Sequence, residues 1–262
     1  MKDNLLIGQY VEANSILHSL DPRTKMISTF VLMLGLWSVD SLEVCSMAAL
    51  FVLAMSKIAG ISVLKMARGL KPLTLVLAFT FLYHAMATDG TVLVAWHAIR
   101  ITMEGLSSGA RYVLRIVLLI LLGSMLTHTT KPLTLALGLE KLMSPLSKLH
   151  VPVEQFSLMI VIAIRFVPTI QEEMERMLLA QKARGYDISR MSLLKRAFAY
   201  VPLLIPLIYN VVQRADQLSL AIDARVYGNG KGRTSYKQLS FQGKDAVAGG
   251  FTAMITILLF WF

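Results

Sequence analysis

Long apolar runs alternate with shorter charged segments along this chain. A helix needs about 20 mainly apolar residues to cross a bilayer. Five runs stand out, the shortest of 14 residues: Met26–Val39, Leu42–Met55, Leu73–Ala87, Leu106–Leu126 and Ala246–Phe262. Only Asp40 and Ser41 separate the first two runs, so we expect a tight helical hairpin there. The pattern predicts an all-α, polytopic integral membrane protein with about five transmembrane helices.

The amino-acid composition supports this assignment. Of the 262 residues, 55% are hydrophobic and 16% are charged, whereas soluble domains carry about 45–50% apolar and about 25% charged residues. These proportions exclude a soluble globular enzyme and a disordered chain. The single cysteine, Cys45, excludes a disulfide-built module. The N-terminus lacks an apolar stretch of about 7–15 residues, so we expect no cleaved signal peptide.

The basic residues indicate an orientation in the membrane. The chain has 26 Lys and Arg against 16 Asp and Glu, a net charge of +10. In a membrane protein this excess is typical of cytoplasmic loops rather than of nucleic-acid binding. The segment before the first run contains Lys2, Arg23 and Lys25, whereas the connection 88–105 contains only Arg100. The charge distribution therefore predicts a cytoplasmic N-terminus.

Segment 131–244 holds 16 of the 26 basic residues and is predicted to lie at the cytoplasmic face. It also contains two apolar stretches, Phe156–Ile170 and Val201–Val212. If both crossed the membrane, six basic residues between them would lie outside, against the positive-inside rule. We therefore expect these stretches not to cross. The resulting regions are a four-helix membrane region at 1–130, the cytoplasmic or inner-face region at 131–244, and a C-terminal transmembrane helix at 245–262.

Two long helices are predicted inside segment 131–244. One covers residues 154–184, and the other runs from about Ser192 to Tyr227. Proline removes a backbone donor and clashes with the preceding helical turn. Helix kinks are therefore expected at three positions: Pro168, Pro202 and Pro206.

Both predicted helices end in alanine and arginine, with a glycine close behind. The residues concerned are Ala183, Arg184 and Gly185 in the first helix, and Ala224, Arg225 and Gly228 in the second. One interpretation is local, since arginine in a last turn complements the helix macrodipole by about 0.3–1 kcal/mol and glycine ends the helix. The other is that small alanines let each helix end enter a partner's groove, where the guanidinium binds a carboxylate. The repetition of the motif favours the second interpretation.

A short polar segment immediately precedes the first apolar run. Its residues are Asp21, Pro22, Arg23 and Lys25. The pattern predicts a helix start, with Asp21 as the N-cap and Pro22 at the first helical position. The two basic side chains are expected at the lipid headgroups.

Catalytic and metal-binding motifs are missing from the sequence. The five histidines are dispersed without a carboxylate partner at ligand spacing, so we expect no metal site. The absence of a P-loop motif predicts that the chain itself does not bind ATP by that route. Asp216 and Asp223 are the nearest approach to a paired carboxylate site. Arg111 and Arg115 either mark a polar path through the fourth run or reach the outer interface.

Three stretches carry a family resemblance: Gly8–Tyr10 with Ser15–Lys25, Arg165–Pro168 with Ala180–Gly185, and Ala221–Gly228. In these stretches the chain resembles the transmembrane (T) component of energy-coupling-factor transporters, relatives of the Q component of cobalt importers. The resemblance covers nearly the whole chain. It departs at Val226, where the family usually has glycine. Either the helix stop shifts to Gly228, or Arg225 is displaced.

The resemblance implies a non-catalytic subunit that links two ATP-binding-cassette ATPases to a small membrane protein. This S component would capture a vitamin or a transition-metal ion. ATP and Mg²⁺ would be bound by the ATPases, so this chain would need no cofactor and no nucleic-acid partner. The two arginine motifs would be the ATPase-coupling sites. The protein would lie in the plasma membrane of a prokaryote.

Two other functions stay open at this point. One is an integral membrane transferase acting on a lipid-linked substrate, with basic residues binding phosphates. The other is a conventional importer permease that forms the substrate pathway itself. The sequence does not indicate the cargo, although the N-terminal signature favours a module shared among vitamin-binding S components.

Overall fold

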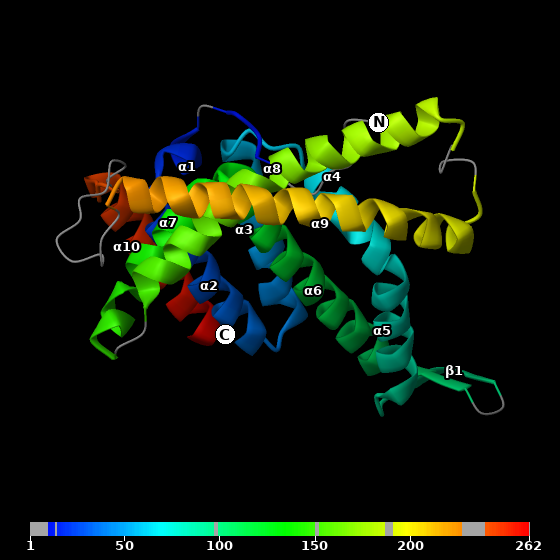
Figure 1. The fold of residues 1–262 in the computed structure, drawn as a ribbon. Coiled ribbons are helices and arrows are strands. Elements are labelled where there is room, and N and C mark those ends of the chain that lie inside the picture. Colours follow the sequence, from blue (N-terminus) through cyan, green and yellow to red (C-terminus); the bar gives the residue numbers. More distant parts are fainter. Residues whose placement is uncertain are drawn as a thin grey trace. The chain divides into compact units, whose positions relative to one another are not determined.

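The computed structural model describes residues 10–13, 15–96, 99–149, 152–186, 191–226 and 239–261, almost entirely as helices (Figure 1). The chain divides into two compact units. The first unit comprises Met1–Leu142 together with Leu239–Phe262, and the second, Met143–Gln238, is inserted between these two segments.

The first unit contains the membrane-type helices. Its elements are α1 (Ile16–Ser19), α2 (Pro22–Ser38), α3 (Leu42–Ile58), α4 (Val63–Ala67), η1 (Arg68–Leu73), α5 (Thr74–Ala87), β1 (Val92–Trp96), β2 (Ile99–Thr102), α6 (Met103–Thr129), α7 (Pro132–Met143) and α10 (Gly243–Trp261). The first two apolar runs form the consecutive helices α2 and α3, but both pack on α6 rather than tightly on each other, so the tight hairpin that was expected is not formed. The antiparallel pair β1–β2, in which Val94 lies opposite Ile101, was not predicted.

Side-chain caps fix the beginnings of the main helices. The Asp21 carboxylate caps α2, the Ser41 hydroxyl accepts a hydrogen bond from the Val44 amide at 3.2 Å, and the Thr102 hydroxyl accepts one from the Gly105 amide at 3.0 Å. Such caps satisfy amides that have no partner inside the helix. The short turns between the apolar runs are therefore encoded locally.

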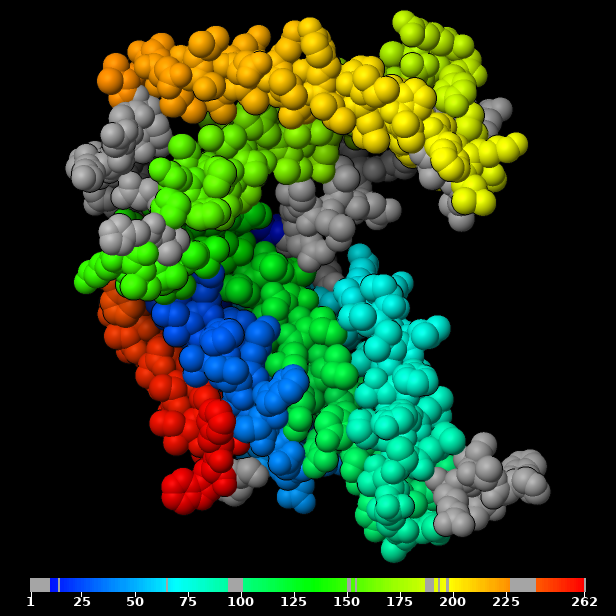
Figure 2. Space-filling model, turned by 60° about the horizontal axis from the view of Figure 1, so that its bottom comes forward, coloured from blue at the N-terminus to red at the C-terminus, as the bar shows by residue number. Residues whose placement is uncertain are grey.

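Helix α6 lies at the centre of the first unit. It packs against α5, α3 and α2, and α10 packs against α2 on the other side. Figure 2 shows this order as neighbouring bands, with α5 in teal, α6 in green, α2 in blue and α10 in red. The buried core between these helices is apolar and includes Leu36, Cys45, Val52, Leu118 and Leu122.

Glycines allow α6 to approach α5 closely. A Cβ atom added at Gly105 would lie 2.7 Å from the Ala85 carbonyl oxygen, and one at Gly109 would lie 2.9 Å from the Phe81 carbonyl oxygen. Small residues at such contacts are typical of helices packed inside a membrane, where backbones come close together. The opposite face of α5 exposes large apolar side chains, among them Leu75 and Phe79.

Four helical segments in the described part of the chain are long and apolar enough to cross a membrane. They are Arg68–Ala87, Met103–Thr129, Leu194–Ala224 and Gly243–Trp261, judged by length and composition alone. Helices α2 and α3 have 17 residues each, which gives each a length of about 25 Å. The third segment includes the stretch Val201–Val212, and its expected position at the inner face stays a prediction.

The second unit is built around two long helices. Its elements are η2 (Ser144–Leu149), α8 (Val153–Ala183) and α9 (Leu193–Ala224). Met177 and Leu178 of α8 pack against Ala199 and Leu203 of α9. Further along, the Glu173 carboxylate of α8 accepts hydrogen bonds from α9, at 3.2 Å from Asn210 Nδ2 and 3.2 Å from Arg214 Nη2. Later residues of α8 thus meet earlier residues of α9, so the helices run in opposite directions.

The three predicted kink residues all lie inside these helices. Pro168 is within α8, and Pro202 and Pro206 are within α9. Both helices are assigned as continuous through their prolines. The bending itself stays a prediction.

Candidate functional site

The C-terminus of α8 is closed by a glycine-dependent cap. Arg184 is the C-cap residue, and Gly185 follows with φ of +86°. The Gly185 amide donates to the Lys182 carbonyl oxygen at 3.0 Å, and the Tyr186 amide donates to the Gln181 carbonyl oxygen at 3.0 Å. These two bonds define a Schellman motif, in which the left-handed residue is usually glycine. The predicted helix stop at Gly185 is confirmed.

The C-terminus of α9 has similar geometry with a different residue. Arg225 is the C-cap, and the Val226 amide donates to the Asp223 carbonyl oxygen at 2.9 Å. Val226 has φ of +51°, so it occupies the left-handed position that Gly185 occupies in α8. The expected shift of the stop to Gly228 is therefore wrong, because α9 already ends before Arg225. Gly228 lies outside the described residues.

Arg225 keeps the position that Arg184 has, despite the valine. Both arginines are C-cap residues, preceded by an exposed alanine at the last helical position. A β-branched residue with positive φ is a steric outlier, of the kind that costs about 1–3 kcal/mol. The second helix end is therefore built like the first, but at a conformational cost.

Both arginines are exposed. Neither guanidinium forms an ion pair or a hydrogen bond with another residue in the part of the chain that the structure describes. Nothing lies within 4 Å of the position that a Cβ on Gly185 would take. We call these two helix ends, residues 183–185 and 224–226, the tips. Each tip presents an exposed guanidinium without an ion-pair partner in the described chain, next to a small alanine side chain.

The two tips lie at opposite ends of the helix pair (Figure 1). With a rise of about 1.5 Å per residue, Arg184 lies about 9 Å beyond the packed residue Leu178, and Arg225 lies about 33 Å beyond Leu203. Since α8 and α9 run in opposite directions, the two helix ends are separated by roughly 40 Å. Two separate protein surfaces could each receive one tip.

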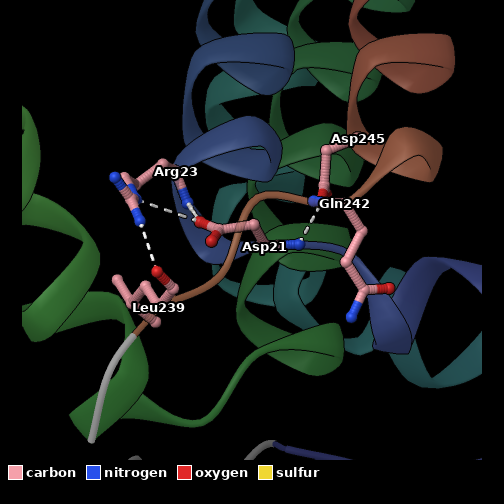
Figure 3. A network of polar contacts seen from close by, with 5 residues as sticks. All are labelled: Asp21, Arg23, Leu239, Gln242 and Asp245. Carbon is pink, nitrogen blue, oxygen red and sulfur yellow. Dashed lines mark hydrogen bonds and ion pairs between the residues drawn. The ribbon is translucent and has the colours of Figure 1, made fainter.

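The N-terminal signature forms a second polar site, in the first unit (Figure 3). Asp21 is the N-cap of α2 and Pro22 is its first residue, which confirms the predicted helix start. Asp21 Oδ1 accepts a hydrogen bond from the Arg23 amide at 2.9 Å and lies 3.3 Å from Arg23 Nε. The Arg23 guanidinium also donates through Nη2 to the Leu239 carbonyl oxygen at 3.0 Å.

Asp245 completes this network from the start of α10. Its side chain is buried, with only 2% exposed. Asp245 Oδ1 accepts from the Asp21 amide at 2.7 Å, and Oδ2 accepts from the Gln242 amide at 2.8 Å. The second bond is half of a capping box, in which an acid in the first turn reaches back to the N-cap amide. Asp245 therefore caps its own helix and holds the start of α2 at the same time.

Lys25 lies in the interior rather than at the headgroups, so that expectation is wrong for this residue. It is 7% exposed. Its Nζ donates to the His18 carbonyl oxygen at 3.2 Å, the Thr129 carbonyl oxygen at 3.1 Å and the Thr130 hydroxyl at 3.3 Å. These bonds use all three donors of an ammonium group. They lie at the C-terminal ends of α1 and α6, where the helix dipole favours a positive charge.

Arg111 and Arg115 have a bonding role that the sequence did not reveal. Their guanidinium groups donate to the carbonyl oxygens of Asp40 and Val39, at the turn between α2 and α3. Arg115 Nη2 also lies 3.6 Å from the Asp40 carboxylate. The last carbonyls of a helix have no partner inside it. These arginines therefore tie α6 to the end of α2.

The described residues contain no group of three or more His, Cys, Asp or Glu side chains placed to hold a metal ion. Asp216 and Asp223, the nearest approach to a paired carboxylate site in the sequence, are both exposed on α9. What the two helix ends offer is charge: the exposed guanidinium groups of Arg184 and Arg225 can recognise an acidic partner.

These features define the class of the molecule as an all-α, multi-pass membrane protein with a helical insertion. Residues 13–236 match the family described as cobalt transport protein, CbiQ. The chain belongs to this family, and relatives at 35–40% identity are transmembrane proteins of energy-coupling factor transporters. It is a transmembrane component of this transporter type.

Several relatives carry the name energy-coupling factor transporter transmembrane protein EcfT. The one from Thermosediminibacter oceani is 39% identical, over 97% of this chain and 96% of its own length. The one from Thermanaerovibrio acidaminovorans is 40% identical, over 97% and 94%. The one from Bacillus subtilis is 36% identical, over 100% and 99%. The similarity therefore extends over both units.

Proposed function

We propose that this chain is the scaffold and energy-coupling subunit of an ATP-driven importer. In this proposal, the conformational change of two ATP-binding-cassette ATPases moves α8 and α9. A separate S component in the membrane binds the cargo, a vitamin or a transition-metal ion. ATP and Mg²⁺ are held by the ATPases, and this chain catalyses no reaction. The observation that carries the proposal is the pair of equivalent arginine tips at Arg184 and Arg225.

The tips have the properties of docking groups. A guanidinium binds a carboxylate through two parallel hydrogen bonds, which fixes orientation as well as affinity. Since Arg184 and Arg225 have no partner within the described chain, neither must break an internal bond in order to bind. The separation of roughly 40 Å, from the helical rise, suits two different ATPase subunits rather than two contacts with one groove.

The two helices are linked so that a force on one tip reaches the other. Glu173 binds Arg214 and Asn210 across the pair, and Leu178 packs close to Leu203. Packed helices shift as rigid elements rather than deforming continuously. A change in the distance between two ATPases would therefore move the helix pair as a unit.

The proposed orientation has the N-terminus and both tips in the cytoplasm of a prokaryotic cell, with the first unit in the plasma membrane. This orientation follows from the excess of basic residues in segment 131–244. ATP is available on that side. The alternative as a lipid-linked transferase would require convergent carboxylates, and no observation in the described residues favours it.

The double substitution Arg184→Ala with Arg225→Ala tests the proposal. Removing a guanidinium from an ion pair buried against a partner costs about 3–5 kcal/mol, because a carboxylate is left unpaired. We expect the ATPase subunits encoded with this chain to co-purify with the wild type and to be lost from the variant. The variant should reach the same amount in membranes, because exposed charges contribute under about 1 kcal/mol to folding.

A matched control is available on α8 itself. Arg176 is also exposed, and within the described part of the chain its guanidinium pairs with Glu172 one turn away, at 3.8 Å. Arg176→Ala removes the same type of charge from the same helix and should leave co-purification unchanged. Normal recovery of ATPases with the double variant would contradict the proposed function.

A further inference from the structure

A cavity of about 490 Å³ lies within the first unit, between the starts of α2 and α10 and the ends of α3 and α6. It exists because α3 and α10 do not pack along each other: α3 packs on α6, and α10 packs on α2. The two helices meet through Phe51 and Phe251, whose ring centroids are 6.1 Å apart. The volume is in the range of pockets that bind small molecules, about 300–1,000 Å³.

The cavity extends about halfway along α10. Its lining on that helix runs from Lys244 to Thr252, which corresponds to a depth of about 12 Å at the helical rise of 1.5 Å per residue. One leaflet contributes about 15 Å of hydrocarbon, half of the thickness of the bilayer core. The cavity therefore has the depth that an acyl chain of a single leaflet would fill.

The lining changes from polar to apolar along this depth. The deep end is apolar and includes Leu32, Phe51 and Leu122. Toward the start of α2 the wall carries hydroxyl groups, among them those of Thr24 and Ser28. The Thr24 hydroxyl is buried without a hydrogen-bond partner in the described residues, which is unfavourable until an acceptor is supplied. The same order is found in a phospholipid, in which ester oxygens follow the headgroup and hydrocarbon follows the esters.

Both charged residues in the lining are basic. Lys25 is buried in the wall, and its three donors bind oxygen atoms of the chain itself. Lys244 is exposed at the start of α10 and has no ion-pair partner in the described residues. The carboxylates of Asp21 and Asp245 accept bonds from backbone amides and are not part of the lining (Figure 3). An anion at this end of the cavity would therefore meet an available ammonium, with a second positive charge behind it.

Exposed apolar side chains border the opening of the cavity. They are Ile16 of α1, Ile58 of α3 and Val247 of α10. Helix α10 is long and apolar enough to cross a membrane from Gly243 to Trp261, so Lys244 at its first turn is expected at the level of the lipid headgroups. The cavity thus opens where a headgroup and the first part of an acyl chain lie.

We propose that this cavity binds an anionic phospholipid of the surrounding bilayer, with one acyl chain in the apolar part and the phosphate at Lys244. Lipid tails are as apolar as leucine, so the chain gains little by leaving the bilayer and the headgroup contact determines which lipid is bound. In the proposed orientation the opening faces the cytoplasmic leaflet, which carries anionic lipids that basic pockets between membrane helices bind.

Two substitutions separate the headgroup contact from the chain contact. Lys244→Gln removes the charge, and its control is Lys57→Gln, an exposed lysine at the end of α3 that lies outside the lining. Ala248→Phe places a ring in the cavity from a half-buried position of the lining. Its control is Ala246→Phe, which adds the same ring to α10 at an exposed position outside the lining.

The purified full-length chain in detergent is equilibrated with equal amounts of dioleoyl phosphatidylglycerol and dioleoyl phosphatidylcholine, and native mass spectrometry measures the lipid that it retains. We expect the wild type and both controls to retain phosphatidylglycerol in preference. Lys244→Gln should lower this preference about fivefold, the contribution of a single lysine near an anionic lipid. Ala248→Phe should retain neither lipid. The buried Cys45 thiol should stay unreactive toward maleimide in every variant, which checks the fold.

Other outcomes overturn the lipid site. Equal retention of the two lipids by the wild type would do so, and so would equal losses of preference in Lys244→Gln and Lys57→Gln, because the effect would then come from diffuse surface charge. Unchanged retention in Ala248→Phe would place the lipid elsewhere. If Cys45 became reactive in that variant, the comparison of the two lysine variants would decide alone.

A transmembrane helix of the S component is the other possible occupant. It would be revealed by a wild-type chain that retains no lipid and by an Ala248→Phe variant that binds the S component more weakly than Ala246→Phe does, and this result would overturn the proposal. The lipid measurements need no ATPase, so their failure is distinguishable from failure of the co-purification test.

Discussion

Two sets of basic residues in this chain have opposite environments. Lys25 and Arg23 bond to backbone oxygens and a carboxylate inside the first unit. Arg184 and Arg225 are exposed at helix ends and have no partner in the described chain. The first set forms its bonds within the molecule, so its loss should affect folding. The second set is incomplete without another protein, so its loss should affect assembly.

Charge reversal at a tip should give the largest effect of all the predicted substitutions, a loss of affinity for the ATPase subunits. Arg184→Glu replaces the guanidinium by a carboxylate facing the proposed acidic groove, and like charges in an interface cost several kcal/mol. We expect the affinity for the ATPase subunits to fall by about a thousandfold or more. The measurement is a binding titration of the purified chain with the ATPases. An affinity within about threefold of the wild type would exclude an arginine–carboxylate contact.

Removing the buried ammonium should give the next largest effect, on folding instead of assembly. Lys25→Met leaves three oxygen acceptors without a donor, and each unsatisfied buried group costs about 1–3 kcal/mol. We expect destabilisation by about 3 kcal/mol or more, which lowers the thermal midpoint by roughly 6–12 °C for a chain of this size. The rate at which the Cys45 thiol becomes reactive on heating provides the measurement.

The exposed neighbour Lys131 supplies the comparison for this experiment. Lys131→Met removes a lysine whose side chain is 55% exposed, and such exposed pairs contribute under about 1 kcal/mol. Equal midpoints for Lys25→Met and Lys131→Met would contradict the buried role of Lys25.

Exchanging the left-handed residues sharpens the comparison of the two tips. Val226→Gly should stabilise the end of α9 by about 1 kcal/mol, because glycine adopts positive φ without the strain of a β-branched side chain. Gly185→Val should destabilise the end of α8 by a similar amount. Hydrogen exchange of the Arg225 and Arg184 amides reports each end. Faster exchange at Arg225 in Val226→Gly would show that the valine conformation is not strained.

The smallest expected effect concerns the contact between α8 and α9. Glu173→Gln weakens the bonds to Arg214 and Asn210, and since the Glu173 side chain is only 22% exposed we expect a loss of about 1 kcal/mol. Glu172→Gln, at a 67% exposed position on the same helix, should cost under about 0.5 kcal/mol. Thermal unfolding compares the stabilities of the two variants. Equal stabilities would show that Glu173 does not stabilise the contact between α8 and α9.

The local pattern of apolar and polar residues was sufficient to predict most of the helices. The apolar run Leu73–Ala87 became α5 at Thr74–Ala87, and Ala246–Phe262 became α10 at Gly243–Trp261. The cap at Asp21 and the stop at Gly185 were also predictable, because each depends on neighbouring residues alone. The hairpin β1–β2 was missed because its strands are only five and four residues long.

The polar network was not predictable, for a physical reason. Asp21 and Asp245 are 224 positions apart, and nothing in a sequence pattern indicates which distant helix ends meet. Asp245 precedes the last apolar run and carried no prediction, and Lys25 was expected at the lipid headgroups. The left-handed backbone conformation of Val226 was also not predicted, because β-branched residues rarely adopt positive φ.

Thiol labelling at the two tips tests the central claim most directly. Ala183→Cys and Ala224→Cys place reactive groups beside Arg184 and Arg225, while Cys45 is buried and unreactive. Membrane vesicles of either orientation are treated with a membrane-impermeant maleimide, with and without the ATPase subunits. We predict that both thiols react only from the cytoplasmic side, and that the ATPases protect both. Labelling from the outer side, or equal labelling with ATPases bound, would contradict the account.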